Sequence, residues 1–214
     1  MAKLTGQTIA ASYDQLLIVG DADGITATAQ AVESADTGGN SSLLYLSTTD
    51  VYSPGTGGTS NTAFGKTAGD ALTTNGNLNA LYGEGAGTAL TTGENNVAVG
   101  YHTLYQGTTE TDDNVAIGYN AMSGAWTTAA VNDCVVIGSG AGAGALTANS
   151  VGTVAIGKSA GAAITAGTNS RENTLIGNHA GASMTIGDGS VAVGAFALDA
   201  EVAGNYSVAI GYEA

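Results

Sequence analysis

The chain has 214 residues, 34 of them glycine, and its formal net charge is −14 because 18 acidic residues outnumber 4 basic ones. So few Lys and Arg residues exclude the basic clusters that bind the phosphate backbone of nucleic acids. The one cysteine, Cys134, excludes an intrachain disulfide and cannot form a zinc site alone. Much of the 43% hydrophobic content is alanine, so we expect a stacked, repetitive fold that packs small side chains against backbone.

We expect no secretion signal at the beginning of the chain. Residues 1–7 have no apolar core of the kind that a signal peptide needs. No stretch of the sequence approaches about 18 uninterrupted apolar residues, the length of a membrane-spanning helix. We therefore expect a protein that is made in a cytoplasm, without a signal peptide and without membrane insertion.

Residues 1–52 do not repeat, and we expect them to form a small N-terminal module. Two apolar runs around acidic turns predict two short strands with too few residues for a core of their own. We expect pairing with other subunits or with another protein to order this module, which makes it the anchor of the chain. The anchor residues are Leu16, Leu17, Ile18, Val19, Leu43, Leu44, Tyr45 and Leu46. Residues 53–60 are expected to be a Gly-rich linker.

Residues 61–214 contain nine copies of a motif in which three mostly apolar residues precede a glycine. Successive motif glycines, here called corner glycines, lie 17 to 20 residues apart. A fixed period of this length is typical of solenoid proteins. The corner glycines are Gly65, Gly83, Gly100, Gly118, Gly138, Gly157, Gly177, Gly194 and Gly211.

Three further registers agree with this alignment. The third residue after the corner glycine is Ala in eight copies of nine, and the fourth residue before it is Asn in five. A large apolar residue follows six of the corner glycines by seven or eight positions: Leu72, Leu90, Trp126, Leu146, Ile164 and Met184.

The motif predicts a short strand, because β-branched residues alternate with a smaller one, as in residues 97–99. The glycine permits a tight corner with positive φ, and Asn also suits a corner. Stacked about 4.8 Å apart, such units form an all-β, parallel β-solenoid of about nine coils that rises roughly 43 Å.

We expect the Val and Ile residues of the motif to fill the coil. The residue between them is Ala in six of nine copies, and this row would then form a flat outer face that another chain approaches closely. A thin rod with few bulky core residues gains stability by burying such a face in a cyclic oligomer. The candidate inter-chain face comprises Ala98, Ala116, Ala155, Ala192 and Ala209.

No arrangement of residues predicts a catalytic, cofactor-binding or metal site, so we expect a protein that is not an enzyme and needs no cofactor. Residues 83–87 and 138–142 are Gly-rich but lack the lysine and the βαβ unit of a phosphate loop. His102 and His179 lie four coils apart, roughly 19 Å, too far to share a metal within one chain. A symmetric site in an oligomer stays open for them.

Glu110, Asp112 and Asp113 predict a solvated loop, with a cation contact, a receptor contact or glycosidase-type catalysis as alternatives. Cys134 occupies the Asn register and is expected to be a packed small thiol. We expect paired threonines to serve turns and hydrogen-bonded ladders, with ice binding as the alternative. The pairs recur in the first four coils: Thr73-Thr74, Thr91-Thr92, Thr108-Thr109 and Thr127-Thr128.

The units Asn96-Val97-Ala98-Val99-Gly100 and Asn114-Val115-Ala116-Ile117-Gly118 resemble two known kinds of repeat. One is the β-roll head of trimeric autotransporter adhesins, and the other, closer in period and in its Thr- and Gly-rich turns, is the repeat region of bacteriophage tail-fibre and related virion proteins. The resemblance covers residues 61–214. Residues 7–19 also resemble the start of phage fibre proteins. We expect neither the signal peptide nor the coiled-coil stalk of the autotransporters in this chain, so a virion protein is the better match.

The resemblance implies a homotrimeric tail fibre or fibre-like appendage of a bacteriophage, located in the virion. Residues 1–52 would attach it to other virion tail proteins, and residues 61–214 would contact a host surface receptor. A tailspike-like polysaccharide depolymerase and an ice-binding solenoid are the alternatives. Because the sequence stops just after the ninth motif, we expect either a longer fibre or another polypeptide stacked on the last coil.

Overall fold

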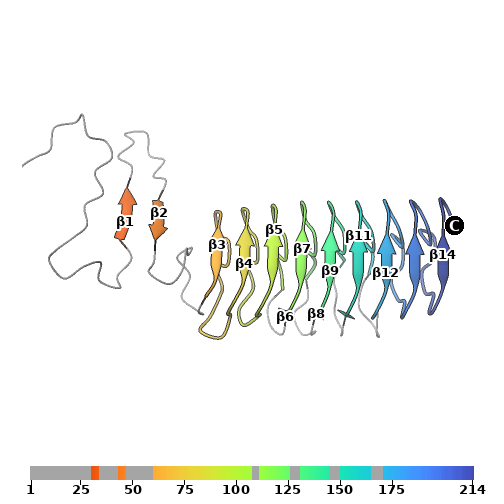
Figure 1. Ribbon diagram of the computed structural model, residues 1–214, viewed down its shortest axis with the longest axis horizontal. Coiled ribbons are helices and arrows are strands. Elements are labelled where there is room, and N and C mark those ends of the chain that lie inside the picture. The colour runs from red at the N-terminus through yellow and green to blue at the C-terminus, as the bar shows by residue number, and fades with distance from the viewer. Residues whose placement is uncertain are drawn as a thin grey trace, which may run out of the picture. The chain divides into compact units, whose positions relative to one another are not determined.

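The structure is a computed structural model that describes residues 30–33, 43–46, 60–107, 111–125, 131–144, 150–164 and 171–214 (Figure 1). The chain divides into two compact units, Met1–Thr48 and Thr49–Ala214. In the first unit, β1 (Gln30–Glu33) and β2 (Leu43–Leu46) pair antiparallel. The strand predicted at residues 43–46 is therefore present, whereas the run at residues 16–19 lies outside the described residues.

The second unit is a parallel β-solenoid, as the repeats predict (Figure 1). Each motif forms one three-residue strand, and strands of successive coils pair in parallel to make a nine-stranded sheet. Nine strands are separated by eight turns, so complete coils are fewer than the nine predicted. The strands are β3 (Thr62–Phe64), β4 (Ala80–Tyr82), β5 (Val97–Val99), β7 (Val115–Ile117), β9 (Val135–Ile137), β11 (Val154–Ile156), β12 (Thr174–Ile176), β13 (Val191–Val193) and β14 (Val208–Ile210).

The register between coils is exact, because each motif residue pairs with the same motif residue of the next coil. Ala98 lies between Leu81 and Ala116, for example. A second, three-stranded parallel sheet follows the same order on two-residue strands: β6 (Thr111–Asp112), β8 (Val131–Asn132) and β10 (Ser150–Val151).

Each strand of the large sheet buries its middle residue and turns its first and third residues outward. The prediction that Val and Ile fill the coil and that Ala forms an outer face is therefore wrong. The alanines of the candidate inter-chain face lie in the core: Ala98, Ala116, Ala155 and Ala192 are fully buried and Ala209 is 9% exposed.

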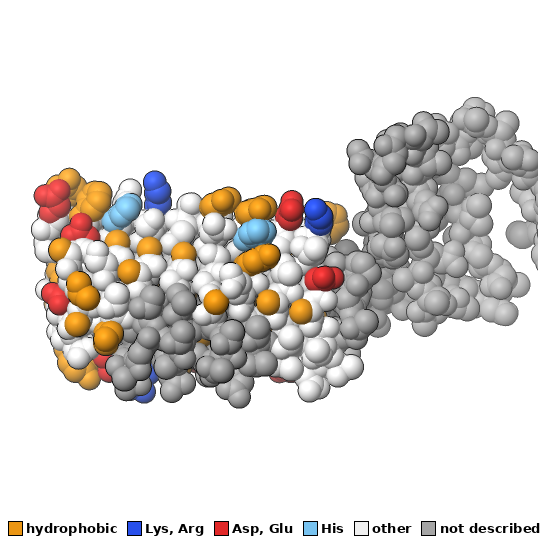
Figure 2. Space-filling model, turned by 180° about the vertical axis from the view of Figure 1, so that it is seen from behind, with side chains coloured by type: hydrophobic (Ala, Val, Ile, Leu, Met, Phe, Trp, Pro, Cys, Tyr) orange, Lys and Arg blue, Asp and Glu red, His pale blue; other side chains and the backbone are white. Residues whose placement is uncertain are grey.

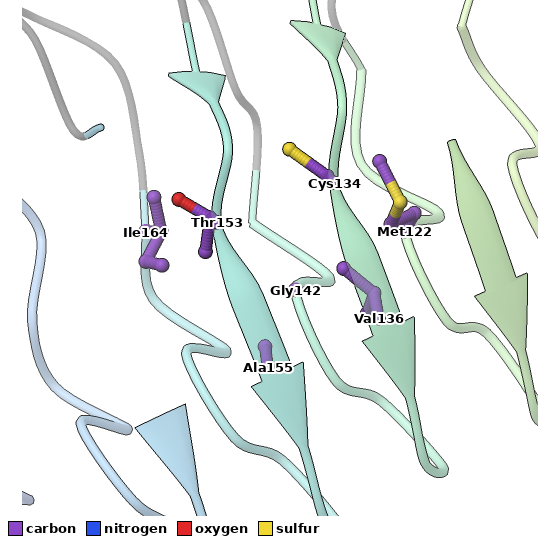
Figure 3. Close-up of a pocket in the computed structure, with 7 residues that line it drawn as sticks. All are labelled: Met122, Cys134, Val136, Gly142, Thr153, Ala155 and Ile164. Atoms are coloured by element: carbon purple, nitrogen blue, oxygen red, sulfur yellow. The ribbon is translucent and has the colours of Figure 1, made fainter. Parts of the chain in front are cut away.

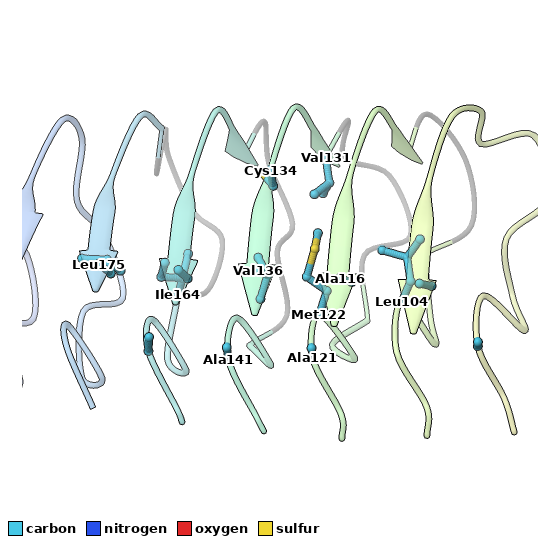
Figure 4. Packing of buried hydrophobic residues seen from close by; sticks show 14 of the residues in the cluster. Leu104, Ala116, Ala121, Met122, Val131, Cys134, Val136, Ala141, Ile164 and Leu175 are labelled. Carbon is cyan, nitrogen blue, oxygen red and sulfur yellow. The ribbon is translucent and has the colours of Figure 1, made fainter. Parts of the chain in front are cut away.

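The coil is too narrow for the arrangement that we expected. A Cβ added at Gly69 would lie 2.8 Å from Leu72 Cδ1 and 3.0 Å from Leu81 Cδ1, so these two leucines already fill the local volume. Leu104 and Met122 are buried four residues after their corner glycines, at the position that Gly69 occupies in the first coil. Figure 4 shows large core residues in one row along the rod and small ones such as Ala121 and Ala141 in a second row beside it.

The chain closes each coil with several residues in the left-handed region of backbone space. The corner glycines have φ between +129° and +143°. The sequence predicts these corners but not three further left-handed positions per coil, which hold glycine in some coils and non-glycine residues with φ near +55° in others, as in Asn95, His102 and Leu104. These extra turns allow a coil to close in so few residues.

Candidate functional site

The corner glycines stack directly on one another. A Cβ on Gly157 would collide with the carbonyl group of Gly177, and the same holds from Gly65 to Gly194, each against the corner glycine of the next coil. The corner glycines therefore form a structural column in which no side chain fits.

Buried asparagines form a hydrogen-bonded ladder beside the strands. In the ladder, Asn96 Nδ2 donates to Asn79 Oδ1 at 3.0 Å and to the Thr111 carbonyl at 2.6 Å. Asn96 Oδ1 in turn accepts the backbone N–H and the Nδ2 of Asn114. Each amide thus satisfies backbone groups inside the rod, which is why a polar residue is tolerated there.

The ladder is interrupted at Cys134 and Thr153, which occupy the Asn register of two successive coils. Asn114 Oδ1 still accepts the Cys134 N–H at 3.0 Å, and Cys134 Sγ donates to the Asn132 carbonyl at 3.3 Å. Among the described residues, the Thr153 hydroxyl is the one buried side-chain polar atom without a hydrogen-bond partner. It lies beside a small internal cavity, which Figure 3 shows with its lining residues Met122, Cys134, Val136, Gly142, Thr153, Ala155 and Ile164.

This cavity does not have the chemistry of an active site. Its lining is apolar apart from the thiol and the threonine hydroxyl. Burial raises the pKa of Cys134 to about 11, so the thiol is protonated at neutral pH and is a poor nucleophile. The packed thiol predicted at Cys134 agrees with this placement.

Of the acidic residues of the predicted loop, Asp112 lies in strand β6 instead and bonds across coils in a second, outer ladder. Asp112 Oδ1 accepts the backbone N–H of Glu94 at 2.8 Å, and the Asp112 N–H donates to Asn132 Oδ1 at 2.9 Å. Asp113 is exposed with φ +59°, and Glu110 lies outside the described residues. Of the paired threonines, Thr73 also bonds to backbone, since its hydroxyl donates to the Thr91 carbonyl. The pairs at residues 108–109 and 127–128 lie outside the described residues.

The two histidines lie among aromatic rings. His102 stacks on Tyr101 and Tyr105 with centroid distances of 3.8 and 4.1 Å, and it covers Gly85 of the preceding coil. His179 stacks on Phe196 at 5.3 Å. In the part of the chain that the structure describes, no group of three or more His, Cys, Asp or Glu side chains could hold a metal ion.

An aromatic stack runs along the corner row, which we define as the residues directly after the corner glycines. Tyr101 and Tyr119 stack at 5.4 Å with an interplanar angle of 8°. Sequence reasoning missed this stack, although two tyrosines at the same register of successive repeats are its signal. The row reads Lys66, Glu84, Tyr101, Tyr119, Ser139, Lys158, Asn178, Ala195 and Tyr212.

The outward residues of the nine strands form the other candidate surface, here called the sheet face. It consists of Thr, Phe, Tyr, Val, Ile and Ala side chains, and not one of them is charged. Phe64, Val99 and Ile176 are 55%, 37% and 37% exposed.

Comparisons with known proteins add no assignment, since no family model, no curated protein and no solved structure matches this chain. Within the described ranges, no helix has the length and apolar character needed to cross a membrane.

Proposed function

We propose that this protein is a structural component of a bacteriophage virion, a tail fibre or fibre-like appendage. Residues 1–52 attach it to other tail proteins, and copies of the chain assemble side by side, as trimers, through the sheet face. The rod contacts the host surface. Support comes from the repeat resemblance and from one structural observation, the uncharged apolar sheet face.

The size of the sheet face supports its burial. Nine strands at about 4.8 Å spacing, with three residues of about 3.3 Å each, span about 43 by 10 Å. An apolar surface of about 400 Å² has the size of the largest apolar patches on soluble chains, which are often functional. Because the face runs almost the whole length of the rod, the partner that fits it is another straight rod.

The charge distribution supports a second copy of this chain as that partner. Each copy carries a net charge of −14, so copies repel one another wherever their acidic residues meet. The sheet face is the place where two copies can approach without opposing carboxylates. Cyclic symmetry then closes the assembly, and the number three comes from the resemblance to trimeric fibres.

Light scattering after size-exclusion chromatography tests the assembly. We expect three times the chain mass for the wild type and the single-chain mass for Val99→Glu combined with Ile176→Glu, both outward on the sheet face. Thr74→Glu, an exposed turn position, is the control and should leave the trimer intact. A monomeric wild type would contradict the assembly.

Immunogold labelling of virions from the phage that encodes the chain tests the location. Label on the tail is the expected result, and removal of residues 1–52 should abolish incorporation. A chain of residues 59–214 that still incorporates would refute the anchor. Release of reducing ends from host polysaccharide would favour the depolymerase instead.

A further inference from the structure

The corner row is held in strict register by backbone hydrogen bonds. The N–H of Gly140 donates to the Tyr119 carbonyl at 2.8 Å, and the N–H of Ser159 donates to the Ser139 carbonyl at 2.9 Å. The side chains of Tyr119, Ser139 and Lys158 therefore leave the rod one after another, about 4.8 Å apart. Along the upper edge of Figure 2, hydrophobic and charged side chains follow one another in this way.

Tyr119 ends the aromatic stack with one ring face open. One face lies against Tyr101, with the rings nearly parallel, so the other face points toward the next coil. There the row holds Ser139, followed by Gly140, and a Cβ added at Gly140 would meet only Ser159 Oγ at 3.6 Å. Neither residue can cover a tyrosine ring, and Tyr119 is 58% exposed. The small residues of the next coil therefore leave this ring face of Tyr119 uncovered. We call the uncovered place above Ser139 the Ser139 step.

The far side of the Ser139 step carries a cation. Lys158 is exposed, and it makes no ion pair in the described part of the chain, where Arg171 pairs with Asp188. Its backbone lies about 10 Å from that of Tyr119, two coil spacings away. Ser139, Ser159 and Asn120 add hydroxyl and amide groups around the step, and no acidic residue occupies the corner row beside it.

We propose that the Ser139 step binds a carboxylated sugar, such as a uronic acid unit of a surface polysaccharide. The apolar face of the sugar ring stacks on Tyr119, its hydroxyls bond to the serines, and its carboxylate pairs with Lys158. A sugar acid fits better than a nucleotide, because a phosphate carries more charge than one lysine balances in a chain of net charge −14. The inference deepens the proposed host attachment by giving the chemical class of the receptor.

Saturation-transfer NMR on the full chain tests this site with methyl β-D-glucuronide and with its neutral counterpart, methyl β-D-glucoside. We expect dissociation constants of about 1–10 mM, with the glucuronide bound about three- to fivefold more tightly. Lys158→Gln should remove that preference and leave glucoside binding unchanged. Tyr119→Ala should abolish transfer from the protein to both sugars.

Two substitutions in the same row serve as matched controls. Lys66→Gln removes an exposed lysine next to Glu84, and Tyr212→Ala removes an exposed tyrosine, and both should leave sugar binding unchanged. Absence of transfer at about 20 mM, a preference that survives Lys158→Gln, or tighter binding of adenosine monophosphate would each overturn the inference. If the chain enters virions but does not bind glucuronide, only the site is refuted. If the chain binds glucuronide but is absent from virions, only the proposed function is refuted.

Discussion

The corner glycines are the positions where a single added carbon atom has the largest effect. Gly157 has φ +134°, and its Cβ would overlap the Gly177 carbonyl, whereas Gly152 has φ +67° with its nearest neighbour, Glu172 Cγ, at 3.8 Å. We expect Gly157→Ala to lower the free energy of unfolding by more than about 3 kcal/mol and Gly152→Ala by about 1 kcal/mol, the cost of strain alone. Urea denaturation measures both, and equal losses would contradict the stacked column.

The thiol of Cys134 makes stability depend on pH in the alkaline range. Its pKa is about 11 in the folded chain against 9.0 when exposed, because burial disfavours the thiolate. The folded state therefore keeps its proton longer, so this stabilisation is complete below pH about 9 and is lost between pH 9 and 11.

We expect the wild type to lose about 2 kcal/mol more than Cys134→Ser over that interval, since the serine hydroxyl does not titrate there. Denaturation at pH 8, 9 and about 10.5 checks it, and the comparison cancels the tyrosines that both proteins share. Parallel pH profiles would show that the thiol is not buried.

At the scale of the element, the asparagine ladder joins neighbouring coils. Asn96→Ala removes the amide that bonds to Asn79 and Thr111 and leaves the Asn114 amide and backbone N–H without their acceptor. We expect a loss of about 3 kcal/mol or more in thermal denaturation, because buried groups are left unpaired. Asn75→Ala, an exposed turn position one coil earlier, should change stability by no more than about 0.5 kcal/mol.

The repeats predict the strands, the corners and the parallel stacking, but not which side of each strand is inside. A three-residue strand such as Val97–Val99 has too few residues for hydrophobicity to decide, and without another signal its bulky residues favour the core. The deciding signal is Asn96, which lies two residues before Ala98 and therefore on the same side of the strand. A run of asparagines in register satisfies itself only in the interior, and it places the alanines there too.

The Ser139 step could not be predicted from composition or spacing alone. It depends on which face of Tyr119 the neighbouring coil covers, and that follows from the exact stacking of coils 17 to 20 residues apart. Once the register is known, the pairing of Tyr119 with the small Ser139 and the more distant Lys158 is readable from the aligned repeats.

For the whole molecule, strict register predicts that complete coils are interchangeable. Removal of one period, residues 101–118, would place Asn96 beside Cys134 and Ala98 beside Val136, in the places that Asn114 and Ala116 hold now. We expect a folded rod with an unchanged β-sheet circular dichroism signal and a small loss of thermal stability. Removal of residues 101–109, a fraction of the same period, should unfold the chain locally. Equal damage from both deletions would contradict the modular rod.

In the corner row, the backbone conformation that the fold requires does not depend on which side chains the row carries. Its backbone is fixed by the glycine before it and by hydrogen bonds to the next coil, yet its side chains range from lysine to tyrosine to alanine. Substitution there alters one point on a line without disturbing the core or the sheet face. The row thus places side chains at fixed intervals of about 4.8 Å along one edge of the rod. Selection can change the surface of this edge one position at a time.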